Sequence, residues 1–102
     1  MRQFDVVENP SRRSRQHAPY FVVLQSHYLA PLDSVLVAPI VRDAARAISV
    51  LDVEVELEGE QLVLTIGELF SIDRGLLKTV RGSVMDQEDA IRRALGRAFT
   101  GF

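Results

Sequence analysis

Residues 51–58, LDVEVELE, constrain the fold more than any other stretch of the chain. Apolar residues alternate with acidic ones along it, and this period of two puts one set of side chains on each face of an extended strand. Gly59 follows, and residues 62–66 form a second apolar run. The sequence therefore predicts a β-hairpin over residues 51–66. Its acidic face is typical of a surface in contact with water.

Two further runs predict strands that are buried on both faces. Residues 20–24 and 35–40 are short and apolar without alternation, which is typical of strands inside a sheet. Pro39 has no backbone N–H, so we expect it at a sheet edge or at the end of its strand. A shorter strand near Phe4 is expected to end at residues 8–10, Glu-Asn-Pro, because that composition favours a turn.

The C-terminal residues predict one amphipathic helix. Apolar residues at 84, 91, 94, 95, 98, 99 and 102 recur at helical spacing. Ser83 or Asp86 is the expected N-cap. The periodicity puts Phe99 on the stripe of Leu95, which predicts a core or supporting residue, and residues 100–102 are expected beyond the helix. Strands followed by a single helix predict a mainly β, antiparallel architecture.

Three connecting segments have less regular patterns. Residues 10–19 are polar and basic without an apolar period, which predicts a loop between two strands. Residues 42–50 fit either a loop or one short helical segment. Asp73-Arg74-Gly75 favours a turn.

Composition narrows the function classes. A chain of 102 residues with 47% hydrophobic content predicts a single domain over residues 1–102. With 12 basic and 14 acidic residues, it has no overall field to attract nucleic acid, so any polyanion binding must be local. There is no cysteine, and His17 and His27 offer little for a metal site, so we expect neither metal nor cofactor. No window approaches the roughly 18 apolar residues of a membrane span, and no apolar leader is seen, which predicts a cytoplasmic protein.

The basic loop carries the clearest cluster of chemically active side chains. Arg12, Arg13 and Arg15 with His17 could bind phosphate or act on RNA, because guanidiniums neutralise charge and histidine transfers protons near neutral pH. Exposed arginines more often form a solvated surface or dock an acidic peptide. His27 is interpreted as structural. Since no phosphate-binding glycine loop or hydrolase motif is present, the residues favour binding over catalysis.

Several segments, in their order along the chain, resemble the CcdB family of toxins that poison DNA gyrase. They are Phe4, the basic loop, PYFVVLQS at 19–26, LVAPI at 36–40, the hairpin over 51–66 and the closing AFTGF. The resemblance runs nearly end to end. It implies a small SH3-like antiparallel β-barrel with a C-terminal α-helix, assembled as a homodimer.

The resemblance also implies a mechanism and two contact surfaces. In such toxins the last helix and tail enter the dimer interface of the gyrase A subunit and hold the enzyme on cleaved DNA, so the chain would be an inhibitor and not an enzyme. The implied gyrase contacts are Thr100, Gly101 and Phe102, with Phe99 as support and Gly96, Tyr28 and Leu29 at the edge. Thr100 stands where the best-known members have Trp.

A CcdA-like antitoxin with a disordered acidic tail is the second implied partner. Its tail is expected to engage Arg12, Arg13, Arg15 and His17 through charge-assisted contacts. Neither a membrane nor direct sequence-specific nucleic-acid binding is expected.

Three alternatives remain open at this point. The MazF and Kid ribonucleases look like CcdB in fold, and a site of that kind would recruit Asp73 together with Arg12, Arg13, Arg15 and His17. An inactive or retargeted homologue is the second alternative. A generic dimeric scaffold with a core-packed terminal helix is the third.

Overall fold

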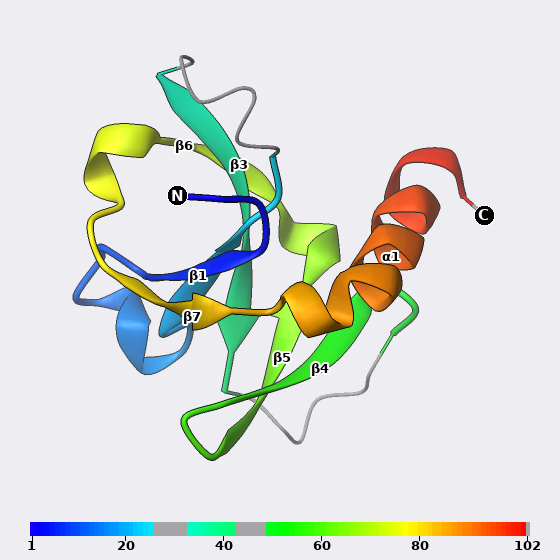
Figure 1. Ribbon diagram of the computed structural model, residues 1–102, viewed down its shortest axis with the longest axis horizontal. Helices are drawn as coiled ribbons and strands as arrows, with labels where there is room; N and C mark the ends of the chain where they lie inside the picture. The colour runs from blue at the N-terminus through cyan, green and yellow to red at the C-terminus, as the bar shows by residue number, and fades with distance from the viewer. Residues whose placement is uncertain (26–32, 43–48, 102) are drawn as a thin grey trace.

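The computed structural model describes residues 1–25, 33–42 and 49–101. The strands in these ranges are β1 (Asp5–Glu8), β2 (Tyr20–Val23), β3 (Ser34–Val41), β4 (Asp52–Leu57), β5 (Glu60–Thr65), β6 (Phe70–Asp73) and β7 (Val80–Ser83). They are followed by one helix, α1 (Glu88–Thr100), and short 3-10 turns lie at Ser14–Gln16, Ile66–Glu68, Arg74–Leu76 and Met85–Gln87. The predicted order of antiparallel strands and a terminal helix is confirmed (Figure 1).

All the strands belong to one antiparallel sheet. Its order is β4-β5-β3-β2-β1-β7, and β6 pairs with β3 off this path. The sheet curls around its core into a half-barrel, with α1 standing at one side (Figure 1). This is the mainly β, SH3-like architecture that the family resemblance implies.

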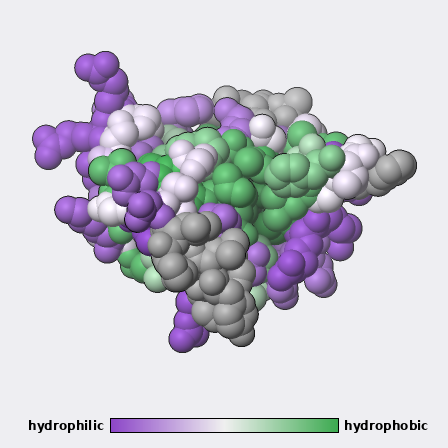
Figure 2. All heavy atoms as spheres, turned by 90° about the horizontal axis from the view of Figure 1, so that it is seen from above, coloured by the Kyte–Doolittle hydropathy of each residue, from purple (hydrophilic) through white to green (hydrophobic). Residues whose placement is uncertain are grey.

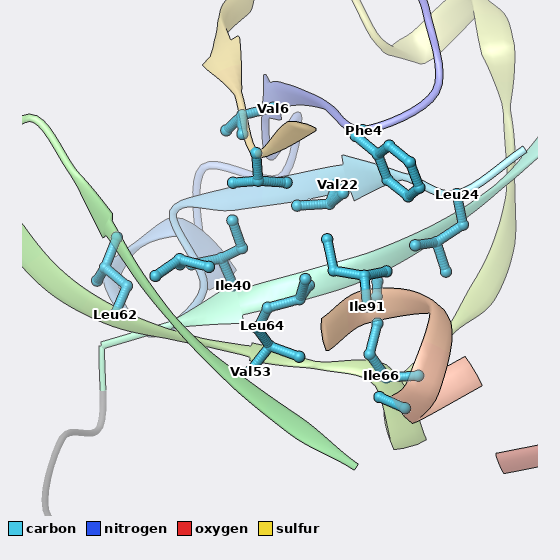
Figure 3. Packing of buried hydrophobic residues seen from close by; sticks show 14 residues of the cluster. Phe4, Val6, Val22, Leu24, Ile40, Val53, Leu62, Leu64, Ile66 and Ile91 are labelled. Carbon is cyan, nitrogen blue, oxygen red and sulfur yellow. The ribbon is translucent and has the colours of Figure 1, made fainter. Parts of the chain in front are cut away.

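The core lies on both faces of the central strands. On one face Val22 and Ile40 pack with residues of β4, β5 and α1, and Figure 3 shows these side chains pointing toward one another. On the other face Phe21 and Val37 belong to a second buried cluster. Alternate residues of β2 and β3 thus enter different clusters, which confirms the prediction of strands buried on both faces. Fully burying one such aliphatic side chain contributes about 1.5–3 kcal/mol.

The β4–β5 hairpin follows its sequence pattern closely. Val53 and Val55 are buried, whereas Glu54 and Glu56 are exposed. The connecting residues Glu58 and Gly59 have φ angles of 52° and 79°. Two central residues with positive φ are what the tight hairpin turn with the right twist requires, so the predicted hairpin is confirmed.

Pro39 lies inside β3, not at a sheet edge or strand end as predicted. It is the register partner of Phe21 in β2. On the other side, pairing with β6 ends at Val37 and pairing with β5 begins at Ile40. The Pro39 carbonyl accepts a 2.8 Å hydrogen bond from the Thr65 hydroxyl on this side. Because the N–H and C=O groups of a strand residue point the same way, the missing donor faces the gap between two partner strands.

The predicted N-caps do not cap α1. The Ser83 hydroxyl accepts the N–H of Met85 at 3.1 Å, at the start of the 3-10 turn that precedes the helix. Asp86 lies within that turn. The α-helix begins at Glu88 without a side-chain cap, and acidic residues in its first turn complement the helix dipole instead.

Several predictions fall on residues outside the described ranges. Most of the segment predicted as loop or short helix is among them (43–48), and so are His27, Tyr28, Leu29 and Phe102. Of the helices that are described, none combines the length and apolarity needed to cross a membrane.

Candidate functional site

The C-terminal turn of α1 extends past the body of the protein. Ile91 and Ala94 are buried, and Leu95 and Gly96 are half-buried. Every described residue from Arg97 onward is exposed. Figure 1 shows this end of the helix standing away from the sheet. We call residues 97–101 the helix end.

Phe99 is an exposed residue, so the prediction that it packs in the core is wrong. Its relative exposure is 69%. The helix is held through Ile91 and Ala94 against the region of β4 and the Ile66–Glu68 turn. The apolar spacing continues for one more turn than the body can cover, and this leaves the aromatic ring in solvent.

The helix end is finished by a glycine cap. The Thr100 hydroxyl donates to the Gly96 carbonyl at 2.6 Å, and Thr100 is the last helical residue rather than a residue beyond the helix as predicted. Gly101 has a φ of 79° and its N–H donates to the Arg97 carbonyl at 2.9 Å. A Cβ at Gly101 would meet nothing within 4 Å, so the positive φ and not crowding favours glycine there.

An apolar band leads to the helix end. Figure 2 shows hydrophobic residues crossing the face seen from above and continuing toward the C-terminal end of α1. The large hydrophobic side chains that are exposed in the described ranges include Met1 and Phe70 as well as Phe99. A contiguous apolar band on a small protein is typical of an interaction surface.

The basic loop between β1 and β2 is organised by one buried side chain, Asn9. This residue is 1% exposed, and its Nδ2 donates to the Ser14 hydroxyl at 2.9 Å and to the Ala18 carbonyl at 2.8 Å. Its Oδ1 accepts the Ser11 N–H at 2.9 Å. The predicted loop is therefore present, and it wraps around a hydrogen-bonded centre.

The structure separates the four predicted residues of this loop. Arg12 and Arg13 are exposed and have no ion-pair partner among the described residues. His17 is exposed beside them. Arg15 turns inward and pairs with Glu8. Two arginines and the histidine thus face solvent, whereas the third arginine belongs to a different site.

Glu8 is the centre of that second site. One carboxylate oxygen pairs with Arg15, and the other lies 2.6 Å from Nη2 of Arg81. The hydrogen bond from Arg81, with the charge of Arg15, holds the pKa of Glu8 below its ordinary value. The same carboxylate raises the pKa of Arg81. Local sequence patterns could not have found Arg81, which is 73 positions from Glu8.

A hollow of about 390 Å³ opens beside this carboxylate. We call it the arginine hollow, and it is lined by Glu8, Arg15, Gln16, Pro19, Tyr20, Arg42, Glu58 and Arg81. The Tyr20 hydroxyl lies 3.4 Å from Oε2 of Glu58, to which it donates. Partial burial raises the pKa of Tyr20, and the negative charge of Glu58 adds to this shift.

Asp73 is far from the basic loop. It is the register partner of Ser34 at the start of β3, whereas the His17 carbonyl accepts the N–H of Arg42 just after the end of β3. At about 3.3 Å per strand residue, these two places are roughly 25 Å apart. The five residues of the ribonuclease alternative therefore do not form one site. The described ranges also contain no cluster of three or more His, Cys, Asp or Glu side chains able to hold a metal ion.

The fold is shared with solved toxin structures. An Mtb toxin superposes with a TM-score of 0.74 at 23% identity, covering 92% of this chain and 99% of its own. The Mycobacterium tuberculosis toxin MazF-mt6 gives a TM-score of 0.73 at 23% identity over 96% of both chains. An endoribonuclease from a mycobacterial species, solved with its cognate antitoxin, gives 0.74 at 9% identity, covering 96% of this chain and 93% of its own. At these identities the likeness concerns the fold.

The fold is thus that of toxin-like half-barrels, and comparison of the sequence with family models identifies the family. The family model for the CcdB protein matches residues 3–101, and the chain therefore belongs to the CcdB family. The predicted family membership is confirmed. No curated protein matches the sequence.

Proposed function

We propose that this chain is the toxin of a toxin–antitoxin pair and that it binds the A subunit of DNA gyrase through the helix end. The observation that carries the proposal is the 69% exposure of Phe99 on a helical turn that leaves the body. A ring in this position adds little to its own fold, and aromatic side chains supply much of the energy of protein interfaces. Membership of the CcdB family supplies the target.

The toxin acts by binding in the cytoplasm, where it holds gyrase on cleaved DNA. The helix delivers Phe99 as a preorganised anchor, because the packed residues Ile91 and Ala94 fix the helix to the body. Thr100 and Gly101 accompany it, and Phe102 is proposed as the aromatic contact that takes the place of the family's larger aromatic at position 100.

A homodimer completes the proposal. The apolar band that reaches the helix end is a surface that a second copy would cover (Figure 2). A two-fold pair would present two helix ends to the gyrase dimer interface, with Gly96, Tyr28 and Leu29 at the edge of the contact. Size-exclusion chromatography with light scattering at micromolar concentration tests this, and a monomer would count against it.

The antitoxin's acidic tail is proposed to engage the outer face of the basic loop. Arg12 and Arg13 have no ion-pair partner among the described residues, so their guanidiniums are available for carboxylates. His17 lies exposed beside them. Arg15 is held by Glu8 and offers only its remaining N–H groups.

Binding to the purified N-terminal fragment of the gyrase A subunit tests the main proposal. Phe99→Ala and a chain ending at Phe99 are compared with wild type by calorimetry. Met85→Ala is the control, since it removes a side chain that is 51% exposed before the start of α1. We expect Phe99→Ala to weaken binding by about tenfold or more and the control to leave it unchanged. Absence of wild-type binding, or equal binding by Phe99→Ala, would contradict the proposal.

The endoribonuclease alternative has weaker support. Solved structures with this fold include endoribonucleases, but Asp73 lies away from the arginines that it would need. Incubating the purified chain with RNA in the absence of gyrase tests it directly. Cleavage that survives Phe99→Ala would favour this alternative over gyrase inhibition.

A further inference from the structure

Three elements each send one guanidinium to the arginine hollow. Arg15 comes from the 3-10 turn of the basic loop, Arg42 follows β3, and Arg81 comes from β7. Tyr20 of β2 lines the same hollow. The hollow is about 390 Å³, within the range of small-ligand sites. None of the residues that line it belongs to the helix end, so it is a separate surface.

A β-bulge brings Arg81 into the site. In the pairing of β1 with β7, Val6 is opposite Gly82 and Val7 is opposite Val80. Arg81 is therefore the extra residue between them. Bulges redirect a side chain, and they are frequent beside functional sites. Here the redirected guanidinium reaches Glu8 at 2.6 Å.

The guanidiniums retain hydrogen-bonding capacity for an anion. Arg15 and Arg81 share the single carboxylate of Glu8. The three side chains Glu8, Arg15 and Arg81 together therefore carry one net positive charge. Nε of Arg15 is buried and has no hydrogen-bond partner in the described chain. Arg42 pairs with Glu60 at 3.0 Å, and its Nη1 donates to backbone carbonyls of the loop. Guanidinium groups with free N–H donors match the geometry of a phosphate.

Acceptors in the same hollow select among anions. Glu58 lines it, and the Tyr20 hydroxyl already donates to this carboxylate. A polyacidic peptide would bring further carboxylates against Glu58, and like charges at close range are unfavourable. A ribonucleotide instead offers hydroxyl donors for Glu58, together with a phosphate for the arginines and a flat base for an aromatic ring.

We propose that the arginine hollow binds one ribonucleotide unit. Its phosphate meets Arg15, Arg42 and Arg81, its ribose hydroxyls meet Glu58, and its base lies against Tyr20. The hollow is expected to hold one unit at a time, because the chain has a net charge of −2 and the nearby hairpin exposes Glu54 and Glu56, so no extended basic surface continues from it. The unit is either a free nucleotide or one residue of a single-stranded RNA.

Fluorescence anisotropy with a labelled short oligouridylate at low salt measures binding, and unlabelled uridine monophosphate is the competitor. Complete competition at similar concentrations identifies the free nucleotide as the ligand. A much tighter oligomer identifies RNA. Failure of the wild-type chain to bind either probe at millimolar concentration would overturn the proposal.

Arg81→Gln and Arg42→Gln test the guanidiniums. Each is expected to weaken binding by about tenfold, since each removes charge-assisted hydrogen bonds. Arg93→Gln is the matched control because Arg93 is also exposed but lies on α1. Circular dichroism melting confirms that each variant is folded. Equal affinity for all three variants would overturn the assignment.

Glu58→Gln separates the nucleotide from an acidic peptide. With a ribonucleotide, this variant loses affinity and loses its preference for ribose over deoxyribose, because the carboxylate that accepts from the 2′-hydroxyl is gone. With an oligoglutamate probe, removal of the negative charge improves binding. Tighter binding of oligoglutamate than of oligouridylate by the wild-type chain, together with a gain in Glu58→Gln, would replace the nucleotide with a peptide ligand.

The inference is independent of the gyrase proposal. A chain lacking the helix end is expected to bind the oligouridylate as wild type does, because no residue of that segment lines the hollow. Conversely, Arg81→Gln leaves Phe99 unchanged, so its binding to the gyrase fragment is expected to persist.

Discussion

The helix end and the arginine hollow are both exposed, but they are built in opposite ways. The helix end has an apolar ring in solvent and is attached to the body only through the buried part of α1. The hollow is made of charged side chains that are tied to one another and to a loop centred on buried Asn9. An apolar group that the fold does not use is available to a partner, whereas a polar network both supports the fold and leaves donors for a ligand.

Ile91→Ala tests the attachment of the helix and has the largest expected effect. Ile91 is fully buried among residues of the main core cluster. Its truncation leaves a cavity and is expected to lower the free energy of unfolding by about 2–5 kcal/mol. Urea denaturation followed by circular dichroism measures it. A loss below about 1 kcal/mol would mean that α1 is not anchored where the structure has it.

Asn9→Ala tests the basic loop beside the arginine hollow, and its effect on stability should be intermediate. The substitution leaves the buried Ala18 carbonyl and the Ser11 N–H without their partner. Such losses cost about 1–3 kcal/mol. The loop should also become more sensitive to proteolysis. If the variant resisted proteolysis as well as wild type does, the role given to Asn9 would be contradicted. Ser11→Ala is the control, since it retains the Asn9 side chain.

Lowering the pH should weaken the ion pairs that Glu8 makes with Arg15 and Arg81. The pKa of Glu8 in the folded chain lies below the ordinary value of 4.5, so its stabilising contribution is present above that pH and is lost as the pH falls through the folded value. Glu8→Gln is expected to flatten the decline of melting temperature below about pH 4.5. Glu54→Gln, at an exposed position of β4, is the control. If the melting temperature of Glu8→Gln declined at low pH as steeply as that of wild type, the stabilising role given to Glu8 would be contradicted.

Phe99→Ala should have the smallest effect on stability. Its side chain is exposed, and exposed substitutions usually change the free energy of unfolding by less than about 0.5 kcal/mol. The contrast with Ile91→Ala on the same helix is the direct test, because gyrase binding is expected to fall while stability is retained. A large loss of stability would show that the ring is packed, as its periodicity predicted.

The two central strands and the hairpin could be predicted because their patterns are local. Alternation from Val53 to Glu58 reports one buried face, and the Glu58-Gly59 turn follows from the need for positive φ. Strands β6 and β7 were less accessible to prediction. Strand β6 alternates over only four residues, and β7 is exposed throughout with Val80 as its one large apolar residue.

The sequence by itself determined the mainly β order, the hairpin, the strands buried on both faces and the CcdB family membership. Only the tertiary structure decided that α1 leaves the body before Phe99, because helical periodicity does not tell where the surface that covers it ends. Tertiary structure also brought together Arg15, Arg42 and Arg81. Arg42 contacts the loop across 26 and 27 positions, and Arg81 contacts Glu8 across 73. Contacts over such separations depend on how the sheet curls, which no local residue pattern records.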